Sequence, residues 1–247
     1  MLRIVAFLLK VNINSYFCGH KILKRTKMKK IILIAAAIAA SVSSYAQVSV
    51  GAGYLNDASK SVYTINKTST ENKTNSNGFY VQGMYGLPIV SSLNLNAGLK
   101  FSYLTNTESG NLDAAGVHLA DATKDTKEMY LALPVLISYG VDITKDFSAS
   151  LFAGPTFSLG LSSKSDVTTT VLGQSKTTNY DNYAKDDDGN ASSYKRGNIF
   201  VGGGLNVDFR DMIRLTIGYD FGLLNRTTVD NTKLTQNQFF VGVSYLF

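Results

Sequence analysis

The chain ends in the sequence Gln238-Phe239-Phe240-Val241-Gly242-Val243-Ser244-Tyr245-Leu246-Phe247, in which every second residue is large and apolar. Because successive side chains of a strand point to opposite faces, this period of two predicts a β-strand with one apolar, aromatic face. The other face is smaller or more polar, with Gly242 and Ser244. The apolar face is formed by Phe239, Val241, Val243, Tyr245 and Phe247.

Seven upstream segments show the same alternation, and none of the eight apolar faces carries a charged residue. These segments are residues 48–55, 79–87, 93–103, 129–141, 147–161, 199–209 and 213–223. Their opposite faces carry Gly, Ser, Asn and several charges, as expected of strands whose apolar side meets lipid. A strand crosses a bilayer in about 9–11 residues, and these segments fit that length.

Long polar connections alternate strictly with short turns along the chain. The long connections are residues 57–77, 106–127, 163–196 and 225–235. Outer-membrane barrels have short periplasmic turns and longer extracellular loops, and a sheet in lipid must close so that no edge is left unpaired. We therefore predict an all-β fold: an eight-stranded antiparallel transmembrane β-barrel over residues 47–247, after an N-terminal signal peptide.

The alternative fold is a soluble β-sandwich or a lipocalin-like barrel that buries the apolar faces. Eight faces rich in Phe, Tyr and Leu would overfill a small barrel, whereas Gly, Ser and Asn pack there with a few longer side chains. Pro134 and Pro155 disturb either sheet, because proline has no N–H to donate. We expect these two prolines at bulges or rims.

The N-terminal part of the chain has the features of a signal peptide. Residues 28–46 combine lysines, an apolar run and a small-x-small ending, which predicts cleavage between Ala46 and Gln47. Residues 1–27 precede this complete signal; we interpret them as a start codon assigned too early, or as an extended basic region. Eight of the 24 Lys and Arg, and none of the 18 Asp and Glu, lie in residues 1–46, so 16 basic residues remain and the net charge is −2 instead of +6.

This charge balance gives no argument for binding nucleic acid. The one cysteine, Cys18, lies in the segment expected to be removed, so the mature chain needs no disulfide and has no thiolate for a metal.

Two stretches resemble a known family. The strand Tyr130-Leu131-Ala132-Leu133-Pro134-Val135-Leu136-Ile137-Ser138-Tyr139, followed by Leu151-Phe152-Ala153-Gly154-Pro155, is similar to the PorT-like outer-membrane β-barrel family. It departs from that family at Ala132, where the family motif has an acidic residue. The architecture also resembles OmpA/OmpX-type eight-stranded barrels.

The C-terminal alternation ending in Phe247 resembles the signal by which such barrels are recognised for insertion. These resemblances imply location in the cell outer membrane, contact with its lipid and lipopolysaccharide, and the barrel-assembly machinery as a partner during insertion.

Several charged residues lie at the alternate strand positions whose side chains are expected to point into the barrel. They are Lys100, Asp208, Arg210, Arg214 and Asp220, with Glu128 near the start of a strand. Buried charges must pair, because an isolated buried ion is very costly. The structural interpretation is a set of salt bridges that fills the barrel; the functional alternative is a gate or a narrow polar conduit. Arg210 and Arg214 flank a turn and so fit the periplasmic rim as well.

Other candidate motifs favour structural explanations. His118 lies in the polar stretch 106–127 without a serine or acidic partner in register, which favours a solvated histidine over a catalytic base. The run Asp186-Asp187-Asp188-Gly189-Asn190 does not fit a calcium loop, since position 12 would be Lys195. Gly202-Gly203-Gly204 lies in a strand with no following helix and is no phosphate loop. We expect no catalytic residues, no cofactor and no metal.

The sequence thus favours a non-enzymatic outer-membrane protein that acts through residues 57–77, 106–127 and 163–196, by binding at the surface or by a structural role in the envelope. A small pore or transporter, and an accessory component of protein secretion, remain as alternatives. The sequence does not identify a surface ligand.

Overall fold

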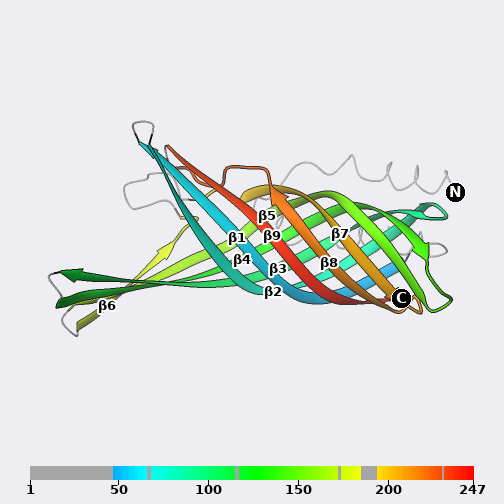
Figure 1. Cartoon of the computed structure of the whole chain (residues 1–247), viewed down its shortest axis with the longest axis horizontal. Helices are drawn as coiled ribbons and strands as arrows, with labels where there is room; N and C mark the ends of the chain where they lie inside the picture. The colour runs from blue at the N-terminus through cyan, green and yellow to red at the C-terminus, as the bar shows by residue number, and fades with distance from the viewer. Residues whose placement is uncertain (1–46, 66–67, 115–116, 172–173, 185–193, 230) are drawn as a thin grey trace, which may run out of the picture. The chain divides into compact units, whose positions relative to one another are not determined.

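The computed structural model describes residues 47–65, 68–114, 117–171, 174–184, 194–229 and 231–247. All regular elements in these ranges are strands (Figure 1). The strands are β1 (Gln47–Ile65), β2 (Thr68–Val90), β3 (Leu93–Ala114), β4 (Val117–Asp142), β5 (Phe147–Val171), β6 (Gln174–Asp181), β7 (Gly197–Phe209), β8 (Ile213–Gly222) and β9 (Thr232–Leu246).

Eight of these strands close into a ring. The ring order is β1, β2, β3, β4, β5, β7, β8 and β9, and every neighbouring pair is antiparallel. Closure occurs between β1 and β9, whose pairing runs from Ser49↔Leu246 to Tyr63↔Thr232. The predicted eight-stranded antiparallel barrel is therefore confirmed. The ninth strand, β6, pairs only with the far half of β5.

The apolar faces point outward. Val50, Leu99, Leu151 and Leu215 are each more than half exposed, although all lie within paired strands. Their neighbours on the other face, such as Ser49 and Lys100, are buried in the lumen. This arrangement excludes the soluble alternative, in which the apolar faces would fill the interior.

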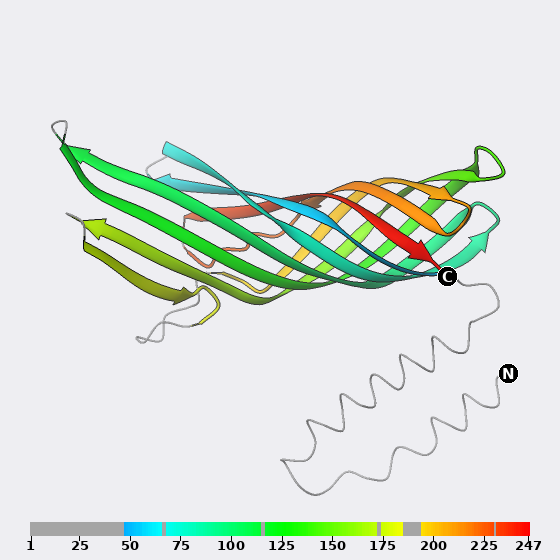
Figure 2. The same cartoon turned by 90° about the horizontal axis from the view of Figure 1, so that it is seen from below.

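Three of the four long connections contain extensions of the strands, which corrects the expectation of polar loops there, whereas in residues 225–235 a strand begins only at Thr232. The β1–β2 pairing continues to Ile65↔Thr68, the β3–β4 pairing to Ala114↔Val117, and β5 and β6 pair to Val171↔Gln174. Figures 1 and 2 show these extensions at the end of the barrel opposite the C-terminus. We call this the hairpin end, and the end with residues 91–92, 143–146 and 210–212 the short-turn end.

Polar residues can build these extensions because backbone pairing needs no apolar face. Threonine favours strands, and its hydroxyl bridges to neighbours across the ladder. Thr168 Oγ1 lies 2.9 Å from Thr177 Oγ1, and Thr170 Oγ1 lies 2.7 Å from Ser175 Oγ.

Pro134 and Pro155 lie within β4 and β5 rather than at a rim. The β4–β5 ladder is interrupted beside them, between the pairs Pro134↔Thr156 and Ile137↔Ala153. The missing proline N–H groups are thus placed where the two strands do not pair regularly.

Candidate functional site: the barrel lumen and its outer mouth

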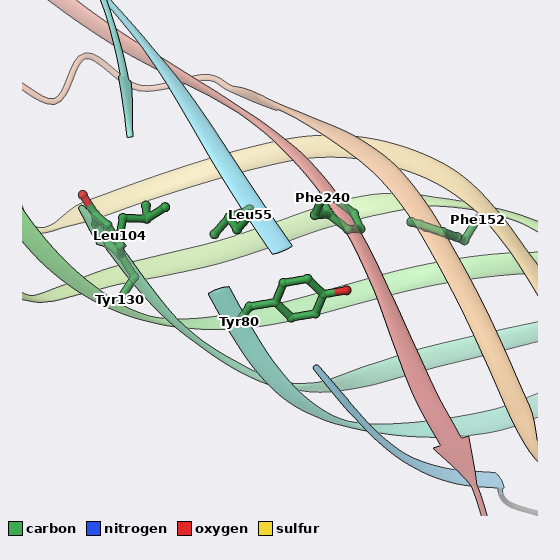
Figure 3. Close-up of a cluster of buried hydrophobic side chains, with 6 residues drawn as sticks. All are labelled: Leu55, Tyr80, Leu104, Tyr130, Phe152 and Phe240. Carbon is green, nitrogen blue, oxygen red and sulfur yellow. The ribbon is translucent and has the colours of Figure 1, made fainter. Parts of the chain in front are cut away.

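Aromatic and aliphatic side chains cross the middle of the lumen (Figure 3). Tyr80 meets Phe240 edge to face, with ring centroids 6.1 Å apart, and Phe152 lies 6.3 Å from Phe240 on its other side. Tyr80 requires glycine opposite it, because a Cβ on Gly242 would lie 2.2 Å from its hydroxyl oxygen. The sequence predicted mainly Gly, Ser and Asn inside, and it missed this aromatic layer. The full cluster comprises Leu55, Tyr80, Leu104, Tyr130, Phe152 and Phe240.

An ion pair lies against this aromatic layer. Lys100 of β3 reaches Asp220 of β8, with Nζ and Oδ2 3.7 Å apart, and both side chains are almost fully buried. The ammonium also lies 5.0 Å from the centre of the Phe240 ring, within the range of a cation–π contact. The pair links opposite sides of the barrel, since β3 and β8 are not neighbours in the ring.

A second ion pair lies nearer the short-turn end. The Arg214 guanidinium donates from Nε and Nη2 to the two carboxylate oxygens of Asp208, at 2.7 and 2.6 Å. A cavity of about 50 Å³ remains in the lumen between the pair of Lys100 with Asp220 and the pair of Arg214 with Asp208. This space is about the size of one or two waters.

Arg210 does not belong to the interior cluster, which corrects the prediction. It lies in the turn between β7 and β8 with a positive φ of 52°, and its side chain is 61% exposed. Its Nε donates to Asp146 Oδ1 at 3.0 Å, and Asp146 lies in the neighbouring turn. Strand β7 ends at Phe209, so the alternation of side chains between its two faces no longer determines where the Arg210 side chain points.

The outer mouth of the lumen is closed by Arg226, a residue that sequence reasoning missed. Arg226 lies between β8 and β9 and is only 1% exposed. Its Nη1 donates to Tyr130 Oη at 2.8 Å and to Gln236 Oε1 at 2.7 Å, while Nη2 donates to Tyr183 Oη at 2.7 Å. The backbone carbonyl of Lys195 accepts from Nε and Nη2 at 3.4 and 3.3 Å.

The charge of Arg226 is retained despite burial. Burial by itself lowers its pKa, but Tyr130, Tyr183 and the carboxylate of Glu128 more than offset that, so the pKa lies above its ordinary value. Glu128, which parity had placed on the inner face, is buried and accepts a hydrogen bond from Ser163 at 3.0 Å. Strands β4 and β9 and the connection between β6 and β7 thus supply the hydrogen-bond partners of one cation.

Beyond Arg226 lies a second cavity of about 230 Å³, which we call the vestibule. It is bounded by the extensions of β1 to β4, by the start of β9 and by Tyr194. Its lining is mostly serine, threonine and asparagine, with Glu108 and Glu128 as acids and Lys124 as a base. Glu108 accepts from Thr74 Oγ1 at 2.5 Å and faces Lys124 across the β3–β4 ladder.

The remaining candidate residues are dispersed. The backbone of His118 lies in β4 and pairs with Asp113, so the expected position in a loop is wrong. Gly202-Gly203-Gly204 lies within β7, as expected. Gln47 begins β1, whereas Ala46 and residues 186–190 lie outside the described residues, as do residues 1–27 and 28–46.

The described residues contain no cluster of three or more His, Cys, Asp or Glu that could hold a metal ion. Within the same ranges, no helix is long and apolar enough to span a membrane.

The terminal aromatic face is exposed on β9. Phe239, Val241, Val243 and Tyr245 point outward, and Phe247, just past the end of the strand, is 73% exposed. The Tyr245 and Phe247 rings pack at 4.8 Å between centroids.

A closed eight-stranded barrel with an apolar exterior and a polar, charged lumen defines the class of outer-membrane barrels. The family model described as the outer membrane protein beta-barrel domain matches residues 36–227. The chain belongs to this family, and its location is the outer membrane. Its architecture is of the OmpA/OmpX type.

Solved structures with similar architecture have low sequence identity to the chain. Ail, the attachment invasion locus protein of Yersinia pestis, is 13% identical, with 82% of this chain and 99% of that chain covered and a TM-score of 0.34. Neisserial surface protein A is 15% identical, with 81% of this chain and 97% of that chain covered and a TM-score of 0.36. The outer membrane protease OmpT of Escherichia coli is 10% identical, with 83% of this chain and 98% of that chain covered and a TM-score of 0.46. No curated protein sequence matches the chain.

Proposed function

We propose that this protein is a non-enzymatic binding protein of the outer membrane that acts through its hairpin end. The observation that carries the proposal is the division of the molecule into a filled barrel and a projecting, polar sheet. Short turns face the periplasm in such barrels, which puts the hairpin end outside the cell. The exposed apolar band then contacts membrane lipid, and the hairpin end rises among lipopolysaccharide.

The filled lumen argues against the alternative of a pore. Arg226, the aromatic layer around Tyr80 and the pair of Arg214 with Asp208 occupy three successive levels of the lumen. An eight-stranded barrel has an interior just wide enough for side chains, and the space left beside Arg214 and Phe240 is the cavity of about 50 Å³.

The extensions are suited to contact with another molecule. All eight residues of β6 are exposed, and among the described residues this strand pairs along one edge only, with β5, so its other edge is open to a further strand. Such edges are otherwise avoided because they pair with other chains. The strand Tyr130 to Tyr139 and the pair Gly154-Pro155 further support placement among PorT-like proteins, and an accessory role in secretion would then use the same exposed extensions.

Shortening the hairpins tests the proposal. Deleting residues 60–73 makes Ser59 and Thr74 a two-residue turn after the pair Ala58↔Asn75 of β1 and β2. Deleting residues 109–123 likewise makes Glu108 and Lys124 the turn after Thr107↔Asp125 of β3 and β4. We expect the shortened proteins to form heat-modifiable barrels in the outer membrane but to lose the surface contacts that site-directed photocrosslinking captures with the full chain. Unchanged crosslinks in the shortened proteins would contradict the proposal.

A further inference from the structure

The vestibule combines a concave shape with an unusual absence of apolar lining. Leu234 is its one aliphatic residue, and nine of the lining residues carry hydroxyl or primary amide groups from Ser, Thr or Asn. Its volume of about 230 Å³ lies below the roughly 300–1,000 Å³ of pockets for drug-sized ligands. The occupant is therefore small, or a small part of a longer chain, and polar.

The charges of the vestibule exclude strongly charged occupants. Glu108 and Glu128 disfavour an anion, and the cation that might attract one, Arg226, already directs its donors to Tyr130, Tyr183, Gln236 and the carbonyl of Lys195. Lys124 and Arg226 likewise disfavour a cation. Two acidic and two basic side chains leave the lining formally neutral.

We propose that the vestibule binds a neutral sugar unit of an oligosaccharide. Carboxylates and amide oxygens accept hydrogen bonds from sugar hydroxyls, and the Ser and Thr hydroxyls donate and accept as the ligand requires. Tyr194 adds an aromatic side chain to the lining, next to the Arg226 guanidinium, which lies 6.0 Å from the centre of its ring. Arg226 forms the floor, so the sugar enters from the hairpin end and the lumen below stays closed.

This inference rests on the proposed surface function and specifies its ligand class. The test is binding of the purified full-length barrel, in lipid nanodiscs, to an array that holds neutral, sialylated and sulfated oligosaccharides. The neutral set contains both bacterial polysaccharide repeats and host-type N-glycans, so that the array also distinguishes the source of the sugar.

The critical variant is Glu108→Ala, because Glu108 lines the vestibule and is only partly buried. The matched control is Glu71→Ala, which removes a carboxylate that pairs with Lys60 and Lys73 and does not line the vestibule. We expect binding of a neutral oligosaccharide to weaken about tenfold in Glu108→Ala, the loss expected for one charged hydrogen bond, and to stay unchanged in Glu71→Ala. If Glu108→Ala fails to form a heat-modifiable barrel, Glu108→Gln replaces it with an expected loss of a few-fold.

Two results would overturn the inference: no neutral oligosaccharide binds, or one binds with equal affinity to the Glu108 variants. If only charged oligosaccharides or a protein bind, and the shortened hairpins abolish that binding, the sugar site fails while the surface function stands. If the shortened hairpins abolish no interaction, the proposed surface function itself fails.

Discussion

At the scale of single residues, the lumen is organised by three basic side chains with different environments. Arg226 satisfies its donors with neutral oxygens, Lys100 pairs with Asp220, and Arg214 pairs with Asp208. A buried group that loses its partner bears the full cost of desolvation, whereas replacing both partners with apolar groups can be nearly neutral. These sites therefore predict different effects for single and paired substitutions.

The pair of Lys100 with Asp220 tests this asymmetry. We expect Lys100→Met to lower the free energy of unfolding by about 3–5 kcal/mol, because Asp220 is left buried beside Phe240 without a cation. The double variant Lys100→Met with Asp220→Leu should recover most of the loss. Urea-induced unfolding in lipid vesicles measures both, and equal stability of the single and double variants would contradict the pairing.

Arg226 should be more important than its position in a connecting segment suggests. Arg226→Ala removes the guanidinium donor from the hydroxyls of Tyr130 and Tyr183, at about 1–3 kcal/mol for each group that stays buried and unsatisfied. Gln236 Oε1 keeps a second donor, Asn198 Nδ2, at 3.3 Å. We expect faster proteolysis within residues 223–231 and a lower temperature for the gel shift on heating. Arg210→Ala is the control, since that arginine is exposed, and similar behaviour of the two variants would refute the account of the outer mouth.

At the scale of elements, the strands that cross the membrane could be predicted and their extensions could not. Alternation marks residues 93–103 because one face meets lipid, whereas Ser69, Thr70 and Glu71 of β2 are polar on both faces and give no period. The same alternation predicted that the side chains of Lys100 and Asp220 point into the barrel. Arg226 gave no signal, because its partner Tyr130 lies 96 residues away and the contact depends on the fold.

The final strand carries a prediction that separates insertion from stability. Phe247 is exposed and lies beyond the end of β9, where its ring contacts Tyr245. We expect Phe247→Ala to reduce the amount of barrel inserted in the outer membrane several-fold, while the inserted protein keeps the stability of the parent in urea. Leu246→Ala is the comparison, since Leu246 is buried and its loss should lower stability. Normal insertion of the Phe247→Ala protein would show that the terminal aromatic residue is not part of the recognition signal.

At the scale of the whole molecule, the closed barrel anchors the strands that extend into the hairpin end. The ring of eight strands leaves no edge in the bilayer, which lipid requires. The extensions beyond it, especially β6, keep an edge that water can satisfy and a partner can pair with. The lumen is closed by its side chains, and the binding that we propose is located on the hairpin end.

The most direct test of this division is conductance of the purified protein in a planar lipid bilayer. The account predicts no stable ion current, because Arg226, the Tyr80 layer and Arg214 obstruct the lumen in succession. The same preparation must show the heat-dependent gel shift of a folded barrel. Reproducible single-channel steps from the folded parent protein would contradict the account and identify the protein as a pore.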